Sequence, residues 1–366
     1  MTGIGVYVSY PFCAQKCTYC NFASGVFAKG LDARYVAALE AEIRSCAWPH
    51  PPDTVYLGGG TPSSLKADAL GRILDAIPGA PWPEATIEVA PGSLTRDAVL
   101  AWRAAGINRV SLGVQSFVEA ELRRTGRKHT AESVARDVAL IRGEGLGNFN
   151  IDLIAGLAGQ TRESWAESLD WVARLEPPHV SVYMLEVDED SRLGLEILNG
   201  GPRFGASEIP GEDLTAEFYE TAVERLQALG IPRYEISNFA RPGAESLHNL
   251  KYWRLQPYIG FGADAHSCVD GLRWQNVETA AGYVARYERG EPAREEESAA
   301  GGGEKFFVGL RLAEGVAPDE SDWRRYGAAF HRFLDGGLLE AAEDRLRLTA
   351  RGVLVSNEVF QEFLDA

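Results

Sequence analysis

The amino-acid sequence predicts an α/β fold: an open, partial TIM-type barrel of about six β-α units, then a C-terminal α+β region that ends in a winged-helix-like module. Three observations predict it. Short apolar runs alternate with amphipathic stretches over the first half of the chain, as in β-α units around a parallel sheet. Polar and glycine-rich motifs fall at the ends of the expected strands, where barrel proteins hold their sites. The alternation stops after about residue 190. Periodicity alone supports a doubly wound sheet almost as well.

Six segments are expected to form parallel strands, because each is a short run rich in β-branched or aromatic residues. They are 4–10, 53–58, 85–90, 107–114, 148–156 and 179–185. Between them, the helix over 31–43 is expected to begin with Asp32 as its cap and to share one apolar face. A second helix is expected to open at Thr95 and to close at Gly106, which suits a left-handed C-terminal cap.

The chain is expected to divide into four parts. Residues 1–190 form the partial barrel, 191–293 cap it, 294–303 are a linker rich in glycine and glutamate, and 304–366 form the winged-helix-like domain. A helix is expected over 211–230. Winged-helix modules often bind DNA, but acidic residues outnumber basic ones after residue 301. This balance favours a role in packing or in binding a protein partner.

Composition and charge narrow the class of protein. The 366 residues are enough for a large core, and no apolar run approaches the length of a membrane span. A net charge of −16 opposes binding to nucleic acid and to anionic membranes, although a local basic patch would still allow peripheral membrane contact. The first residues carry no basic leader, and three of the five cysteines are bunched. Both features favour the reducing cytoplasm.

The cysteine motif "YPFCAQKCTYCNFASG" raises the question of what its three thiols bind. Cys13, Cys17 and Cys20 follow the first expected strand with the spacing C-x3-C-x2-C. A structural zinc site needs four ligands, and this loop has three cysteines but no histidine to complete the set. A disulfide would leave one thiol over. Three packed free thiols are an alternative, but thiolates that hold an iron–sulfur cluster explain the bunching better.

This motif, with Tyr19 just before Cys20, resembles that of the radical S-adenosylmethionine (SAM) superfamily. The resemblance implies a [4Fe-4S] cluster with three irons held by the cysteines. The fourth iron would be chelated by the amino and carboxylate groups of SAM. It also implies an electron donor if SAM is cleaved, since one-electron reduction breaks a C–S bond there and yields a deoxyadenosyl radical.

Further residues fit the same ligand. Glycines let the backbone approach it closely, carboxylates accept hydrogen bonds from its ribose or ammonium, and an arginine pairs with its carboxylate. The coproporphyrinogen-III oxidase-like branch has matching residues in the same order, which here are Tyr7, Gly60, Thr61, Glu88, Gln115, Arg127 and Asp152. Taken singly, the triple glycine would be read as a turn, Glu88 as a salt-bridge partner and Arg127 as a solvated helix residue.

Within that branch the chain is most similar to the HemW family of haem chaperones. The oxidases carry a fourth cysteine two residues after the third and a longer N-terminal extension, whereas this sequence has Phe22 there. The motif "HNLKYW" (248–253) matches a pattern that the chaperones associate with haem, which makes 191–293 the haem-associated part. His248 and Tyr252 are candidate haem ligands, one turn apart if the stretch is helical. The alternative is that these residues do not bind haem: His248 would be hydrogen-bonded within the fold, and the rings of Tyr252 and Trp253 would pack in the core.

Three functions follow from the resemblance. The first is a haem chaperone that carries a [4Fe-4S] cluster, binds SAM and haem, takes haem from a donor and delivers it to acceptor proteins. The second is oxygen-independent coproporphyrinogen III oxidase, and the third a radical SAM methyltransferase or cyclopropanase. His266 is a weaker haem candidate, and Cys46 and Cys268 are expected to be buried small residues.

Overall fold

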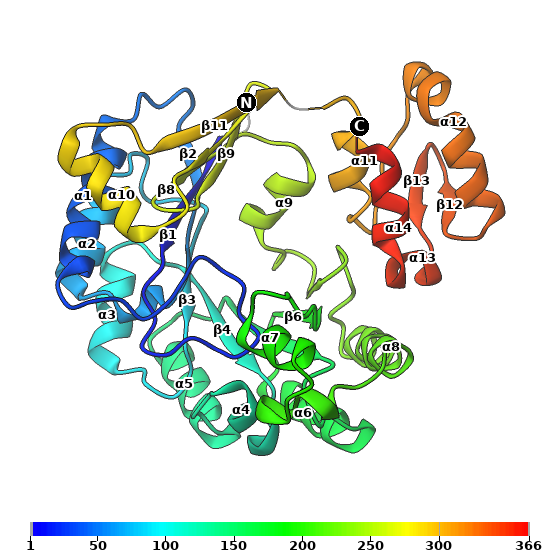
Figure 1. The fold of residues 1–366 in the computed structure, drawn as a ribbon, viewed down its shortest axis with the longest axis horizontal. Coiled ribbons are helices and arrows are strands. Elements are labelled where there is room, and N and C mark those ends of the chain that lie inside the picture. Colours follow the sequence, from blue (N-terminus) through cyan, green and yellow to red (C-terminus); the bar gives the residue numbers. More distant parts are fainter. Residues whose placement is uncertain (1–2, 300, 365–366) are drawn as a thin grey trace.

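The structure is a computed structural model that describes residues 3–299 and 301–364. Its centre is a sheet whose strands run in the order β11-β10-β9-β8-β1-β2-β3-β4-β5-β6-β7. Six consecutive parallel strands curve into an open barrel (Figure 1): β1 (Ile4–Tyr10), β2 (Pro52–Gly59), β3 (Glu84–Val89), β4 (Arg109–Gln115), β5 (Phe149–Ala155) and β6 (His179–Met184). Their spatial order follows the chain without the reversal that defines a doubly wound sheet. The partial barrel is therefore confirmed.

The helices that follow these strands cover the outside of the barrel (Figure 1). They are α1 (Leu31–Ser45), α2 (Ala67–Asp75), α3 (Arg96–Ala104), α4 (Glu119–Thr125), α5 (Ala131–Gly143) and α6 (Arg162–Leu175), with a short η1 (Pro62–Ser64) before α2. Alternate strand residues such as Val6, Val55 and Leu57 are fully buried against this layer. The intervening residues face the inside of the barrel, and most of them are polar.

The ends of the helices test the local predictions. Thr95 caps α3 by accepting a hydrogen bond from Ala98 N, and Gly106 takes the left-handed conformation with φ 95°, as predicted. The predicted cap at Asp32 is wrong. Gly30, with φ 87°, is the cap residue of α1, and Asp32 lies inside the first helical turn. A glycine can take the left-handed conformation that brings the chain out of the preceding loop there.

The later chain extends the sheet at both edges. After α7 (Arg192–Leu198), η2 (Arg203–Glu208) and α8 (Glu212–Ala228), β7 (Asn238–Ala240) pairs antiparallel with β6. The chain then crosses through α9 (Leu247–Trp253) to the opposite side, where β8 (Tyr258–Phe261) pairs parallel with β1. Helix α9 therefore spans the open side of the barrel (Figure 1). The outer elements are β9 (His266–Val269), β10 (Leu272–Asn276), α10 (Ala280–Arg289) and β11 (Arg294–Ala299).

Strand β11 corrects part of the predicted linker over 294–303. Residues 294–299 pair antiparallel with β10 as the last strand of the sheet. The glutamate-rich composition that suggested a linker also suits an edge strand, whose free side faces water.

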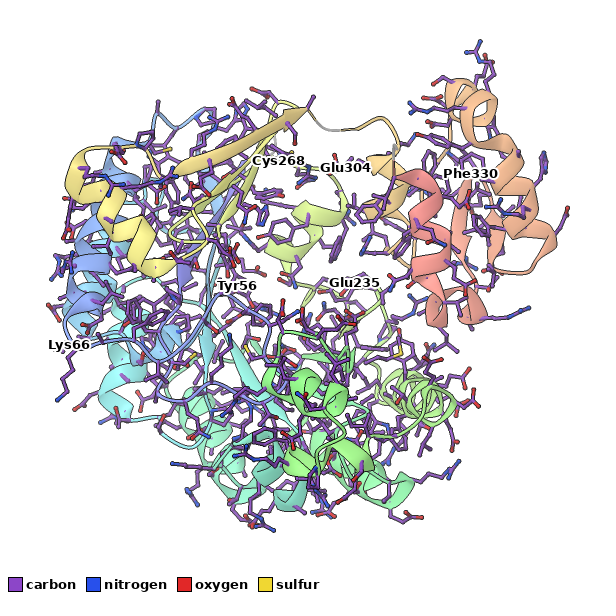
Figure 2. All side chains as sticks on the ribbon, in the orientation of Figure 1. Tyr56, Lys66, Glu235, Cys268, Glu304 and Phe330 are labelled. Carbon is purple, nitrogen blue, oxygen red and sulfur yellow. The ribbon has the colours of Figure 1, made fainter. Side chains whose placement is uncertain are left out.

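A separate α+β module follows: α11 (Glu304–Gly309), α12 (Glu320–Asp335), β12 (Leu339–Ala342), β13 (Arg345–Leu348), α13 (Ala350–Leu354), α14 (Ser356–Phe360) and η3 (Gln361–Phe363). Its own core is built from Phe306, Phe330 and Phe363, whose ring centroids lie 5.0–5.7 Å apart (Figure 2 labels Phe330). The module contacts α9, because the guanidinium of Arg311 lies 5.2 Å from the ring centroid of Trp253. Within residues 3–299 and 301–364, every helix is too short or too polar to cross a membrane.

Candidate functional site

The side chains that face the inside of the barrel are mostly polar, and we call the space that they line the chamber. TIM barrels are usually filled with branched apolar side chains, but here one inward-facing residue on each of the strands β1 to β6 keeps some exposure. These residues are Tyr7, Tyr56, Glu88, Gly113, Asp152 and Tyr183. The rings of Tyr7 and Tyr56 are stacked with centroids 6.1 Å apart (Figure 2 labels Tyr56). The chamber therefore offers aromatic faces and carboxylates to a ligand.

The cysteine loop lies at the end of β1 and is fixed by its backbone. Cys13 N donates to Gly25 O over 2.8 Å, and Gly25 N donates to Pro11 O over 2.9 Å, so the loop closes on itself. Thr18 N donates to Thr125 O, which ties the loop to α4. All three cysteines are half-buried free thiols.

Side chains near the thiols affect their ionisation. Burial raises the pKa of Cys13, while hydrogen bonds from the hydroxyls of Thr61 and Ser24 lower it. The Thr61 hydroxyl lies 3.6 Å from Cys13 Sγ, and the Ser24 hydroxyl lies 3.7 Å from Cys20 Sγ. Because metals bind thiolates, a metal centre held by these thiols would release protons on binding and would be favoured as the pH rises.

The number and kind of the ligands bear on the kind of metal centre. In the part of the chain that the structure describes, no group of three or more His, Cys, Asp or Glu side chains is arranged to hold a single metal ion. Zinc would need its sulfur ligands about 2.3 Å from one point. In a four-iron cluster each cysteine binds a different iron, so the sulfurs lie farther apart. Three free thiols on one loop are the donor set that such a cluster needs.

The "GGGTP" segment packs directly on the start of the cysteine loop. Gly60 N donates to Tyr10 O and Thr61 N donates to Phe12 O, both over 2.9 Å. A Cβ at position 60 would lie 2.7 Å from Pro11 C and 2.8 Å from Phe12 O. A glycine is therefore required at position 60, since two backbones approach too closely for any side chain.

Glu88 and Asp152 are the carboxylates of the chamber. Tyr56 Oη donates to Glu88 Oε1 over 3.0 Å. Burial and the negative charge of Asp152 raise the pKa of Glu88 to about 7. Burial also raises the pKa of Asp152, against hydrogen bonds from Ser181, Asn150 and Ser111 that lower it. Glu88 can therefore gain or lose a proton near neutral pH.

Arg127 is a half-buried cation that fits an anionic ligand. Its Nη1 donates to Gly113 O over 2.7 Å, and its Nη2 donates to Tyr19 Oη over 3.4 Å. Its Nε is buried and has no hydrogen-bond partner, and among the described residues no carboxylate pairs with it. A carboxylate of a bound ligand would satisfy both needs. Beside it, Gln115 adopts φ 72° at an irregularity of β4, a strained conformation of the kind that gathers at functional sites.

The "HNLKYW" motif forms α9, so the predicted helical spacing of His248 and Tyr252 is correct. Neither nitrogen of the His248 ring is free. Nδ1 lies 2.9 Å from Thr54 Oγ1, and Nε2 lies 2.8 Å from Tyr252 Oη. The ring is fully buried, and this burial lowers the pKa of His248 to about 3. The cavity beside it, which Thr54, Leu247 and Lys251 help to line, measures about 140 Å³ and is too small for a porphyrin.

Glu84 holds α9 in place across the barrel. Its carboxylate accepts hydrogen bonds from Leu247 N and His248 N, each 2.9 Å long, and from Ser246 Oγ. The His248 ring stacks on Tyr56 with centroids 5.4 Å apart. The motif therefore forms one wall of the chamber, next to the residue that binds Glu88.

The remaining candidates fall outside the chamber. His266 is exposed on β9, and Cys268 is buried as predicted. Cys46 is only half-buried, so its prediction as a buried residue is wrong. Sequence reasoning missed Tyr56 and Tyr183. The alternation in "TVYLG" places Tyr56 on the same face as Thr54 and Gly58, and this signal could have found it.

The open barrel, the three-cysteine loop after its first strand and the polar chamber define a radical SAM protein, and the sequence profile "Radical SAM superfamily" matches residues 7–172. The fold is shared with coproporphyrinogen III oxidase (HemN) from Escherichia coli, a radical SAM enzyme. The TM-score is 0.83 at 24% identity, over 99% of this chain and 90% of that one. At this identity the likeness concerns the fold.

Curated relatives place the chain within the superfamily. It is 34% identical to "Heme chaperone HemW" of Bacillus subtilis over 98% of both chains. It is also 34% identical to the protein of that name from Lactococcus lactis, over 98% of this chain and 96% of that one. The chain belongs to the HemW family.

Proposed function

We propose that this protein is a cytoplasmic haem chaperone, which takes haem from a donor and passes it to acceptor proteins. The observation that carries the proposal is the full-length match to relatives named heme chaperone, which includes the chamber, α9 and the C-terminal module. Phe22, 66% exposed, stands where the oxidases resembled by this chain have a fourth cysteine. The free thiols of all five cysteines suit a reducing compartment.

The resident cofactors would be a [4Fe-4S] cluster on Cys13, Cys17 and Cys20 and a SAM molecule in the chamber. Together they supply one-electron chemistry when bound. Eight residues are proposed to bind SAM: Tyr7, Tyr19, Gly60, Thr61, Glu88, Gln115, Arg127 and Asp152. Their roles differ. Arg127 would bind a carboxylate with its unpaired Nε, Glu88 and Asp152 would accept hydrogen bonds from hydroxyl or ammonium groups, and the Gly60 segment would keep the backbone close to the cluster loop.

Haem binding by α9 would require a local rearrangement. The imidazole of His248 reaches an iron only if its Nε2 leaves the hydroxyl of Tyr252, or its Nδ1 leaves Thr54. The hydrogen bond between His248 and Tyr252 is internal to the motif, so it competes with the metal for the same nitrogen. Because of this competition, the effects of His248 and Tyr252 on haem binding can be separated by mutation.

The test is an anaerobic haem titration, followed by absorbance, of the wild type and the His248→Ala and Tyr252→Phe variants. If Nε2 binds iron, His248→Ala weakens saturable binding about tenfold or more, since a ligand bond is lost. Tyr252→Phe leaves the imidazole in place and frees its nitrogen, so it keeps or strengthens binding. Equal binding and equal spectra in all three proteins would exclude α9 as the haem site.

The alternative function is the decarboxylation of coproporphyrinogen III, the reaction of an oxidase whose fold this chain shares. Absence of saturable haem binding together with anaerobic, SAM-consuming turnover of that substrate would overturn the chaperone proposal. Methyl transfer to a small molecule would instead support the third function.

A further inference from the structure

A chain of hydrogen bonds links Tyr234 to the chamber carboxylate of Asp152. It runs from Tyr234 through His179 and Asn150 to Asp152, and we call it the relay. Tyr234 follows α8, His179 begins β6, and Asn150 and Asp152 lie two residues apart on one face of β5. His179 and Asn150 are 1% and 2% exposed. Their polar atoms must therefore find partners within the fold.

The orientation of the Asn150 amide is fixed by Asp152. Asn150 Nδ2 donates to Asp152 Oδ1 over 2.6 Å, because a carboxylate oxygen at this distance needs a donor. The amide oxygen then faces away from Asp152 and lies 2.7 Å from His179 Nδ1. An amide oxygen can only accept, so His179 Nδ1 carries a proton and donates it. Ser111 Oγ donates to Asp152 Oδ2 over 3.2 Å, so both oxygens of the carboxylate are held.

The His179 ring connects this amide to Tyr234. Burial and the charge of Arg109 lower the pKa of His179, so the ring is neutral at pH 7. A neutral imidazole with its proton on Nδ1 accepts at Nε2, and the Tyr234 hydroxyl donates to that nitrogen over 2.8 Å. The Tyr234 oxygen in turn accepts a hydrogen bond from Ser246 N over 3.2 Å. Every proton of the relay thus has one consistent position.

The outer end of the relay is held by the backbone on two sides. Tyr234 N donates to Asn238 O over 3.0 Å, and Ala313 N of the C-terminal module donates to Tyr234 O over 2.9 Å. The next residue, Glu235, forms a β-bridge with Leu312 of the same module (Figure 2 labels Glu235). Contacts outside the barrel therefore determine where the Tyr234 hydroxyl lies.

We propose that Tyr234, His179 and Asn150 are positioning residues. Through the relay they orient the Asp152 carboxylate toward the hydroxyl groups of a nucleoside ligand in the chamber. The inference deepens the proposed function, since it rests on SAM binding there. Asn150 and Ser111 use one lone pair on each oxygen of Asp152, and the remaining lone pairs can accept from a vicinal diol such as that of ribose. A carboxylate held in this way loses less rotational freedom when the ligand binds, which favours binding.

The first test compares two ligands by anaerobic isothermal titration calorimetry. The protein carries a reconstituted cluster in the oxidised state, so SAM is bound without being cleaved. The ligands are SAM and its 2′,3′-dideoxy analogue, which lacks both ribose hydroxyls. Tyr234→Phe removes the hydroxyl that donates to His179, and we expect it to weaken SAM binding about fivefold, the effect of one hydrogen bond. It should leave the affinity for the dideoxy analogue unchanged, whereas a merely structural residue would change both affinities alike.

Tyr219→Phe is the matched control, because it removes another buried phenol hydroxyl beside the same segment. The Tyr219 hydroxyl donates to Ile236 O and takes no part in the relay, so this variant should bind both ligands as the wild type does. Asn150→Asp should weaken SAM binding more than Tyr234→Phe, because it places a second negative charge beside Asp152. Unchanged SAM binding in Tyr234→Phe, or an equal loss for both ligands, would overturn the proposal.

A second measurement needs neither cluster nor ligand. Nitrogen-15 NMR of the histidine-labelled apoprotein distinguishes the two neutral forms of an imidazole, and the signals of His179 are those missing from His179→Gln. We expect the proton on Nδ1 at pH 7. A proton on Nε2, or on both nitrogens, in a protein that binds SAM would overturn the relay alone. The expected form in a protein that binds no SAM would instead reject the SAM site of the proposed function, and with it the role of the relay.

Discussion

Glu88 stands out among the residues of the chamber because its environment places its titration near neutral pH. Burial and the charge of Asp152 raise its pKa to about 7 from an ordinary value of 4.5. The hydrogen bonds from Tyr56 and from the backbone of Gly59 lower the pKa and only partly offset this effect. A ligand with an ammonium or hydroxyl group would favour the ionised form. Binding such a ligand near pH 7 would therefore release a proton.

This shift predicts how stability depends on pH. Between pH 4.5 and about 7 the folded chain keeps a proton on Glu88 that the unfolded chain has released, so the free energy of unfolding falls as pH rises. In the apoprotein, Glu88→Gln should match the wild type near pH 5 and exceed it at pH 8, by on the order of 1–2 kcal/mol. Urea unfolding at both pH values measures this. A stability difference that is the same at both would contradict the pKa shift.

At the scale of single elements, α9 shows how a short helix is positioned by distant residues. Seven residues are too few for a stable helix in isolation. Its N-terminal amides are satisfied by Glu84, and its Lys251 Nζ binds Gly3 O and Asp53. The helix is therefore positioned by contacts with the beginnings of the strands. Its position in turn determines where the His248 ring packs on Tyr56.

Glu84→Ala should destabilise the protein by about 3–5 kcal/mol, because it leaves buried N–H donors without their acceptor and the buried Arg109 guanidinium without its ion-pair partner. Glu84→Gln keeps an acceptor oxygen and should cost clearly less. Urea unfolding of the apoproteins gives both values. A cost below about 1 kcal/mol for the alanine variant would show that α9 is held by other contacts.

At the scale of the whole molecule, the C-terminal module packs on α9 and also contacts the segment around Tyr234 and strand β10. Arg311 joins the module to α9, since its guanidinium lies over Trp253 of α9 and over Phe307 and Phe360 of the module, 5.2, 4.9 and 4.3 Å from their ring centroids. Movement of the module is therefore coupled to the wall of the chamber.

Arg311→Ala should increase amide hydrogen exchange in α9 about tenfold while β1 to β6 keep their protection, since a buried cation–π contact contributes about 1–2 kcal/mol. Arg254→Ala is the matched control, because its ion pair with Glu314 is exposed and contributes little. Exchange that rises equally in both variants would show that Arg311 has no special part in the contact.

The sequence predicted the parallel barrel well, because strands such as β1 and β5 combine β-branched residues with a sharp alternation of inward and outward faces. It failed where long-range contacts decide. The edge strand β11 looks like a linker, since only its pairing with β10 orders it. The tertiary bonds of His248 to Thr54 and of Glu84 to the α9 backbone join residues far apart in the chain, and no local pattern reveals them. For the site, the sequence reveals which residue types are present, whereas only the structure shows that Arg127 and Glu88 are half-buried inside the barrel.

The crossing of α9 to the far edge of the sheet has a consequence for biosynthesis. The first strand acquires its second neighbour, β8, only when residues near 258 have left the ribosome, and the bond between Lys251 and Gly3 spans 248 positions of the chain. Until then, β1 offers one unpaired side directly below the cysteine loop. Contacts of such long separation form slowly. The nascent barrel therefore stays open on this side through most of translation, and its chamber is sealed late, once the region that carries "HNLKYW" has been made.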